Sequence, residues 1–235
     1  MFVAWVDAEG RLFRVIQDGT SQDDRAHSVL QQPDGHVVVA GVTDGDFLAP
    51  LSGPRPAQLF LVAYDTAGDR LWVVQYRPGG ADVISAVLTP AANGSGEFYV
   101  AGVYERTTAL GSSYVLKYAA NGTQLWETLI GQPPDNGDYR VHALAADHTG
   151  LLFVAGEADS SLKGEPFIGN GQNCLLLKLD SATGDILDVA LQATSSGRQS
   201  CRHLALDTAH HALIAAGIVT LGNSDDAFVA NYSVP

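Results

Sequence analysis

Several residue types and motifs that define common enzyme classes are scarce in this sequence or missing from it. The two cysteines, Cys174 and Cys201, do not make a disulfide-rich scaffold, and they form no Cys-x-x-Cys pair, which excludes a zinc ribbon or a thioredoxin-type motif. No Gly-x-Ser-x-Gly, His-Glu-x-x-His or Walker motif occurs either. The sequence therefore predicts no catalytic residues and no cofactor, and it favours a binding protein over an enzyme.

Long apolar runs are also missing. A transmembrane helix needs about 18 or more apolar residues in succession, so none is expected here. Residues 1–7 have the pattern of a strand and lack the basic and apolar regions of a signal peptide. The phase of the repeats described below favours a chain that has lost its natural start.

Basic side chains are few. The chain has 13 Lys and Arg against 26 Asp and Glu, which gives a formal net charge of −13. The average field of such a chain repels polyanions, so nucleic acids and anionic membranes are not expected as partners.

One short apolar phrase, by contrast, is abundant. A run ending in Ala-Gly recurs with its glycine at positions 41, 102, 156 and 217, in steps of 61, 54 and 61 residues. A period of this size, built from short strands, is typical of a repeat architecture. The 25 glycines and 10 prolines indicate many turns between those strands.

Each repeat predicts four short strands, of which the Ala-Gly strand is the second. In the second repeat the expected strands cover residues 85–89, 97–104, 114–118 and 124–130, and an Asn-Gly hairpin turn joins the last two. Four antiparallel strands per repeat predict an all-β fold, namely a β-propeller of four-stranded blades whose first strands line a central channel.

The repeat pattern resembles a known family. Residues 33–41 (Pro-Asp-Gly-His-Val-Val-Val-Ala-Gly) and 60–72 (Phe-Leu-Val-Ala-Tyr-Asp-Thr-Ala-Gly-Asp-Arg-Leu-Trp) are similar to the SBBP family, bacterial proteins with seven-bladed β-propeller repeats. The resemblance extends over essentially the whole chain. It implies a propeller fold and an extracellular or cell-envelope location, but it names no function because the family's roles are diverse.

The chain begins and ends on a strand of the third type. Counting predicts seventeen strands, which is four blades plus one extra strand in a single propeller domain or segment. The expected units cover residues 1–26 (strands three and four of a blade), 27–82, 83–138, 139–200 and 201–235. We therefore expect a piece of a longer propeller, or an arc that another copy completes, and self-association if the propeller is open.

The first strand of each repeat carries the candidate ligand site. His27 and His142 hold one equivalent position, which Ser85 and Arg202 hold in the other repeats, with His203 adjacent to Arg202. In a propeller this position lies near one mouth of the channel. Convergence of these side chains would suit an anionic ligand better than a metal ion, because Arg202 repels cations. The alternative is a ring of solvated side chains with no ligand.

Two further features leave alternatives open. Cys174 and Cys201 are expected at the same end of neighbouring blades, so they either form a disulfide or remain reduced. Acidic residues in glycine-bearing loops leave calcium as an alternative to no cofactor, although none follows an EF-hand pattern. Asp24, Asp82 and Asp138 recur just before first strands, which indicates turn-capping residues instead.

The leading functional hypothesis is a non-enzymatic propeller scaffold that binds a protein or a glycan through its loop face. One alternative is a ligand-binding propeller, or a hydrolytic or lyase propeller, that uses the channel mouth. A third is a quinoprotein-like or outer-membrane-assembly propeller, because residues 180–187 resemble the Asp-x-x-Thr-Gly-x-x-Leu of those repeats.

Overall fold

The computed structural model of the chain describes residues 1–48, 56–78, 82–105, 111–132, 135, 137–168, 171–193, 197–210, 212–222 and 224–233. These residues form a row of antiparallel sheets. None of the helices in the described ranges is long and apolar enough to cross a membrane.

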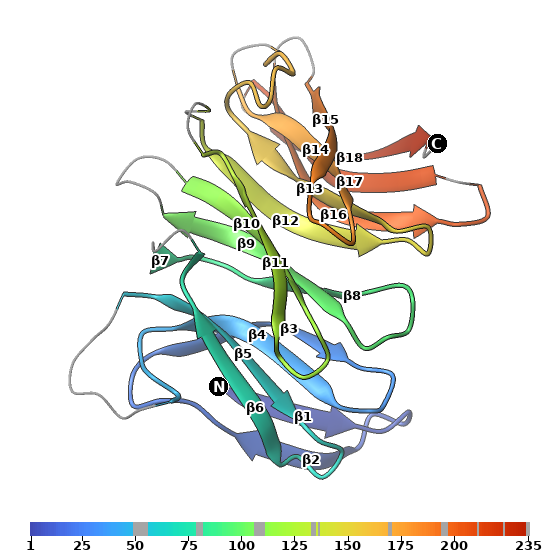
Figure 1. The fold of residues 1–235 in the computed structure, drawn as a ribbon. Coiled ribbons are helices and arrows are strands. Elements are labelled where there is room, and N and C mark those ends of the chain that lie inside the picture. The colour runs from blue at the N-terminus through green and yellow to red at the C-terminus, as the bar shows by residue number, and fades with distance from the viewer. Residues whose placement is uncertain are drawn as a thin grey trace.

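Five consecutive groups of strands make up the row (Figure 1). The N-terminal sheet consists of β1 (Phe2–Val6) and β2 (Leu12–Gln17). The first blade contains β3 (Asp24–Gln31), β4 (Val37–Thr43), β5 (Gln58–Tyr64) and β6 (Arg70–Tyr76). The second contains β7 (Asp82–Val83), β8 (Val87–Pro90), β9 (Phe98–Glu105), β10 (Gly111–Tyr118) and β11 (Gln124–Ile130). The third contains β12 (Tyr139–Ala146), β13 (Leu151–Ala158), β14 (Asn173–Asp180) and β15 (Ile186–Gln192). The C-terminal sheet contains β16 (Gly197–Asp207), β17 (Ala212–Leu221) and β18 (Ser224–Ser233).

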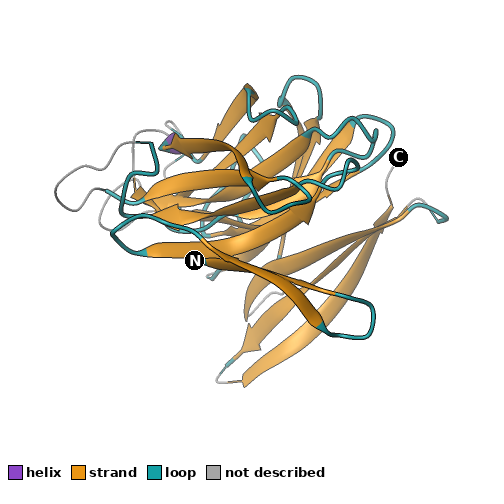
Figure 2. Cartoon of the chain, turned by 90° about the horizontal axis from the view of Figure 1, so that it is seen from below, coloured by secondary structure: helices purple, strands orange, loops and turns teal. Residues whose placement is uncertain are grey.

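The arrangement confirms the predicted propeller architecture and its phase. The sheets stack face to face as an arc, with the N-terminal sheet at one end and the C-terminal sheet at the other (Figure 1). Strands dominate the described structure, and loops connect their ends (Figure 2). By position in the repeat, β1 and β18 are both strands of the third type, as expected.

The first strand of the second blade is divided in two and does not start where it was predicted. Residues 85–89 were expected as a single first strand of the second blade, but β7 and β8 are separated by residues 84–86. The backbone nitrogens of Ile84 and Ser85 both donate to the carbonyl oxygen of Val103, at 2.8 and 3.3 Å, so the ladder is distorted there. The described structure accordingly has eighteen strands rather than seventeen.

The glycine of the repeated phrase has a steric cause. A Cβ atom at Gly41, Gly102, Gly156 or Gly217 would lie 2.1, 1.9, 2.0 or 1.9 Å from the carbonyl oxygens of Arg25, Ser85, Arg140 and Ser200, respectively. Three of these oxygens belong to the neighbouring first strand, and that of Ser85 lies in the break between β7 and β8. No larger residue fits at these glycines without moving the backbone. The repeat therefore keeps glycine where two strands approach most closely.

The blades bury both faces of their central strands. Every residue of β4 is buried, and so is nearly all of β5. Between the first two blades, Trp72 stacks on Phe98 with ring centroids 6.3 Å apart, and its ring lies against Gly122. Trp126 occupies the same place between the second and third blades, against Tyr99 and Gly184. The predicted strands were nearly continuous apolar runs because neighbouring blades cover both faces.

Candidate polar site on the inner strands

Three of the predicted site residues occupy structurally equivalent bulges. His27, His142 and Arg202 are each the extra residue of a register shift between the first and second strands of their sheets. A bulge turns the side chain of its extra residue away from the regular alternation, and such positions are common beside functional sites. The sequence alignment of these three residues is confirmed.

Ser85 lies one residue before the equivalent position. Val87 faces Ala101 as Ser28 faces Ala40, so Ala86 is the counterpart of His27. The Oγ atom of Ser85 instead accepts a hydrogen bond from the Val103 nitrogen at 3.1 Å. The sequence alignment was wrong for Ser85 because the distortion of the second blade occurs earlier along its strand.

His27 joins two blades and does not meet the other predicted site residues. Its Nδ1 atom accepts a hydrogen bond from the backbone nitrogen of Ala86 at 3.2 Å. Burial lowers the pKa of His27, and the charge of Arg25 lowers it further. An acceptor nitrogen and a lowered pKa both favour the neutral ring, so His27 has a structural role at this junction.

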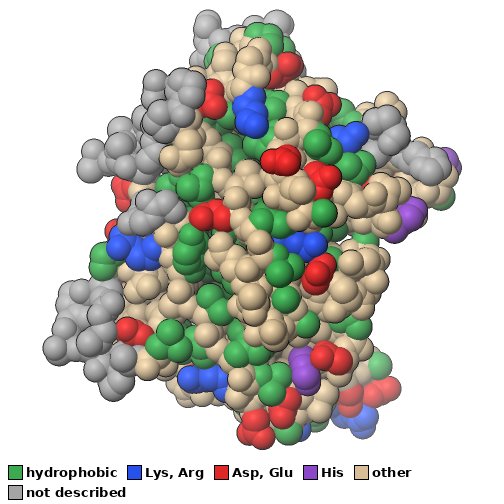
Figure 3. Space-filling model, in the orientation of Figure 1, with side chains coloured by type: hydrophobic (Ala, Val, Ile, Leu, Met, Phe, Trp, Pro, Cys, Tyr) green, Lys and Arg blue, Asp and Glu red, His purple; other side chains and the backbone are tan. Residues whose placement is uncertain are grey.

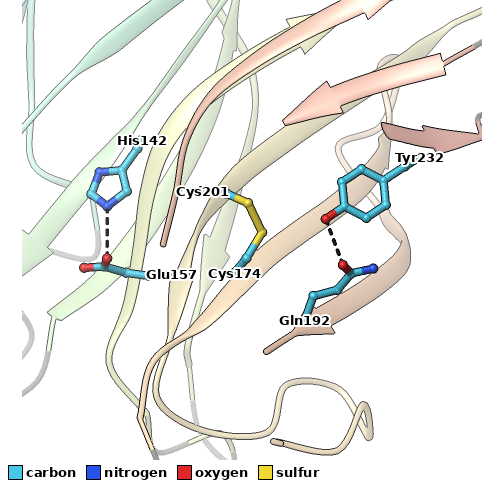
Figure 4. Close-up of a disulfide and its surroundings, with 6 residues drawn as sticks. All are labelled: His142, Glu157, Cys174, Gln192, Cys201 and Tyr232. Atoms are coloured by element: carbon cyan, nitrogen blue, oxygen red, sulfur yellow. Dashed lines mark hydrogen bonds and ion pairs between the residues drawn. A yellow bond between two sulfur atoms is a disulfide. The ribbon is translucent and has the colours of Figure 1, made fainter. Parts of the chain in front are cut away.

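His142 and Arg202 do converge, on a carboxylate that the sequence analysis missed. The Oε2 atom of Glu157 lies 3.7 Å from Nε2 of His142 and 3.3 Å from Nη2 of Arg202. Figure 4 shows the His142 ring directed at this carboxylate. The Glu157 side chain is only 7% exposed. Glu157 directly follows the Ala-Gly pair of its repeat, and the other repeats have Val42, Val103 and Ile218 at this position. A charged residue in place of an aliphatic one was the signal in the sequence that could have identified it.

The electrostatics hold Glu157 ionised. Burial alone would raise the pKa of its carboxyl group, but the contacts with His142 and Ser200 and the charge of Arg202 outweigh burial and lower the pKa to about 2. At neutral pH the site therefore contains a fixed carboxylate beside a guanidinium.

Several polar atoms around this carboxylate remain unsatisfied. Within the described part of the chain, Nε2 of His142, Oγ of Ser200 and Nε of Arg202 are buried and make no hydrogen bond of normal geometry. His142 stabilises the charge of Glu157 from 3.7 Å, which is longer than a hydrogen bond. Leaving a buried polar group unpaired costs about 1–3 kcal/mol, so three such atoms in one place call for an explanation. A bound polar group would supply their missing partners.

A disulfide fixes the site. Cys174 and Cys201 are bonded, with Cα atoms 5.0 Å apart, which settles the open alternative of the sequence analysis. Cys174 lies opposite Glu157 in the β13–β14 ladder, and Cys201 lies between Ser200 and Arg202 on β16. The bond ties the third blade to the C-terminal sheet beside the carboxylate (Figure 4).

His203, the remaining predicted residue, does not join the site. It pairs with Ala216 after the bulge and is exposed. The next residue, Leu204, packs toward the third blade, so His203 lies on the opposite face of β16.

Of the three recurring aspartates, Asp24 caps a turn as predicted, whereas the contacts of Asp82 and Asp138 are ion pairs. Asp24 accepts hydrogen bonds from the backbone nitrogen of Thr20 and the hydroxyl of Thr43, both at 2.6 Å. Asp82 pairs with Arg77 and Asp138 with Arg140. Among the residues whose placement is described, no group of three or more His, Cys, Asp or Glu side chains is arranged to hold a metal ion.

Comparison with known proteins supports the fold alone. No protein-family model and no curated protein matches the sequence, so the SBBP resemblance stays a prediction. Among solved structures, the chain is similar to the Dos1 propeller at 13% identity and a TM-score of 0.54, with 93% of this chain and 49% of that one covered. It is also similar to a periplasmic gluconolactonase, PpgL, of Pseudomonas aeruginosa at 18% identity and a TM-score of 0.55, with 100% and 66% covered. The fold is that of a β-propeller. The chain spans less than two thirds of either structure.

Proposed function

We propose that the protein is a non-enzymatic binding module that takes a neutral, hydroxyl-rich ligand, such as a glycan, at the Glu157 site. The observation that carries this proposal is the group of unpaired buried atoms around a buried carboxylate. A hydroxyl group donates one hydrogen bond and accepts others, so it can serve Glu157 and Arg202 together.

The charges of the site disfavour the other ligand classes. An anionic group would be repelled by Glu157, and a cation would be repelled by Arg202. An anion was expected from the histidines and Arg202 alone, and the carboxylate of Glu157 removes that preference. With the carboxylate and guanidinium already paired, a neutral ligand leaves their attraction intact.

A hydrolytic propeller is the second candidate, since one similar structure is a gluconolactonase. The titration of Glu157 weighs against it. A general acid or base works best with a pKa near the operating pH, whereas Glu157 has a pKa of about 2. This carboxylate is better suited to accept hydrogen bonds than to exchange protons.

The quinoprotein-like pattern has a structural explanation. Gly184 of that motif has a positive φ of 79° and lies against the Trp126 ring, and Thr183 hydrogen-bonds Asp185 within the turn. The motif thus serves the junction between the second and third blades. A location outside the cytosol belongs to our proposal, because disulfides persist in oxidising compartments.

Calorimetric titration with a panel of neutral oligosaccharides tests the function. We expect at least one to bind, and Glu157→Gln to weaken it by about tenfold or more, the usual effect of losing a hydrogen bond to a charged group. Glu97→Gln, which removes the Lys117 ion pair of the second blade, is the matched control and should leave binding unchanged.

Two results would contradict the proposal. One is that no neutral oligosaccharide binds, or that Glu157→Gln binds as well as the unmodified protein. The other is turnover of a sugar lactone that Glu157→Gln abolishes, because that outcome would establish the hydrolytic candidate instead.

A further inference from the structure

The two ends of the arc expose apolar faces that resemble the interior of the molecule. In the N-terminal sheet, Val3, Trp5 and Ile16 pack on the first blade. The alternate side chains point the other way, and these apolar residues are exposed: Phe2, Val6, Phe13 and Val15. We call the face formed by Phe2, Val6, Phe13 and Val15 the leading face.

The opposite end shows the same division. In the C-terminal sheet, Leu213, Ala215 and Phe228 pack toward the third blade. Ile218 and Val229 lie on the other side of the sheet and are exposed. We call the face formed by Ile218 and Val229 the trailing face.

The strand registers show which residues of the first blade are equivalent to the leading face, and what covers them there. Phe2 faces Gln17 on β2 as Phe60 faces Gln75 on β6, and Val6 likewise corresponds to Tyr64. Phe60 and Tyr64 belong to the core cluster that packs against the N-terminal sheet. Phe2 is 71% exposed and Phe60 is 0% exposed. The leading face is therefore the surface that, in the first blade, is covered by the preceding sheet.

The same comparison applies to the trailing face. Gly217 faces Phe228 as Gly41 faces Phe60, so Val229 corresponds to Leu61 and Ile218 to Val42. Leu61 and Val42 lie in the core shared with the second blade. Val229 is 72% exposed and Leu61 is 0% exposed. The trailing face is therefore the surface that, in the first blade, is covered by the following one.

We propose that the leading face of one copy of this chain packs against the trailing face of a second copy. The junction between the first two blades joins a trailing surface to a leading surface. Each copy has one exposed surface of each kind, and none of its own described residues covers either of them. Contiguous exposed apolar faces of this kind mark association sites. The contact is head-to-tail, so it can continue into a ring or a filament.

Net charge gives the contact a salt dependence. Two copies with a formal charge of −13 each repel one another, and salt screens that repulsion while leaving apolar burial intact. Association should therefore strengthen as ionic strength rises, whereas a contact held by ion pairs would weaken.

Sedimentation velocity on paired variants tests the proposal. Val6→Asp disables the leading face and Val229→Asp the trailing face, and both side chains are exposed, so the fold of each copy should survive. The unmodified protein should form oligomers that grow with concentration and salt, and each variant alone should be monomeric. A mixture of the two should form a one-to-one dimer and nothing larger, because it retains one working contact.

Leu187→Asp is the matched control. It places the same charge at an exposed apolar side chain of the third blade, outside both faces, and should leave association intact. Circular dichroism confirms the fold of each variant. The proposal fails if the unmodified protein is monomeric at its highest soluble concentration. It also fails if either variant self-associates alone, or if the mixture stays monomeric.

Discussion

Two junctions of the arc bring similar strands together by different means. Between the first and second blades, Trp72 stacks on Phe98 in an apolar seam. Between the third blade and the C-terminal sheet, the strand register puts Asp188 in the place of Trp72, and an open groove of about 190 Å³ remains, lined in part by Leu176, Leu213 and Tyr232. A disulfide and the Glu157 ion cluster join that second pair of sheets.

The first junction is stabilised by apolar packing, whereas the second contains a buried charge whose desolvation lowers stability unless its contacts offset it. Apolar packing stabilises without special partners, whereas a buried carboxylate needs its charge and hydrogen bonds satisfied. Deviations from the packing rules of a fold tend to fall at functional sites. The charged side chains visible in Figure 3 lie scattered over the surface, whereas the Glu157 side chain at this junction is only 7% exposed.

Removing the disulfide should have the largest effect on stability, because this bond ties the third blade to the C-terminal sheet. The Cys174→Ala/Cys201→Ala protein should lose about 2–4 kcal/mol of unfolding free energy, as expected for a cross-link of this loop size. Hydrogen exchange should rise first in β16–β18, because the covalent tie holds that sheet. The unmodified protein under reducing conditions is the control. Uniform exchange across all blades would show that the C-terminal sheet does not depend on the bond.

Trp72→Ala should weaken the apolar seam by a similar or slightly smaller amount. Removing a largely buried aromatic ring costs about 3 kcal/mol, because contact area is lost and a cavity remains. Urea unfolding followed by tyrosine fluorescence measures the change. Leu71→Ala, at the exposed neighbouring position, should cost far less. Equal losses in both variants would mean that the stacking on Phe98 is not what joins the blades.

Glu157→Gln should have the smallest effect on stability, about 2 kcal/mol at neutral pH, and a distinct pH dependence. The carboxyl pKa is lower in the folded state, about 2, than its ordinary value, so its contribution is full above pH 4.5 and disappears as pH falls toward 2. Unfolding free energies at pH 7 and pH 3 measure this. The difference between variant and unmodified protein should shrink at the lower pH, and a constant difference would contradict the assigned cause.

Much of the fold was predictable because it depends on local pattern. The Ala-Gly pair marks the second strand of each repeat, since only glycine fits against the adjacent carbonyl oxygen. Once the second strand is located, its position identifies the other strands of the repeat. Trp72 and Trp126, on the fourth strands, indicated where neighbouring blades pack, because such large apolar side chains need a neighbouring blade to bury them. The break at residues 84–86 was not predictable, because the distortion there arises from two backbone nitrogens sharing one carbonyl oxygen.

The sequence by itself determined the repeat, the four-stranded unit and the equivalence of His27, His142 and Arg202, because spacing along the chain sets register and periodicity. Only the tertiary structure decided which of these side chains meet. Arg202 reaches Glu157 across 45 residues of sequence, from one sheet to the next, and the disulfide holds the two strands at that distance. Contacts between polar side chains of different sheets depend on how the sheets stack in space, and the spacing of residues within one repeat does not specify that stacking.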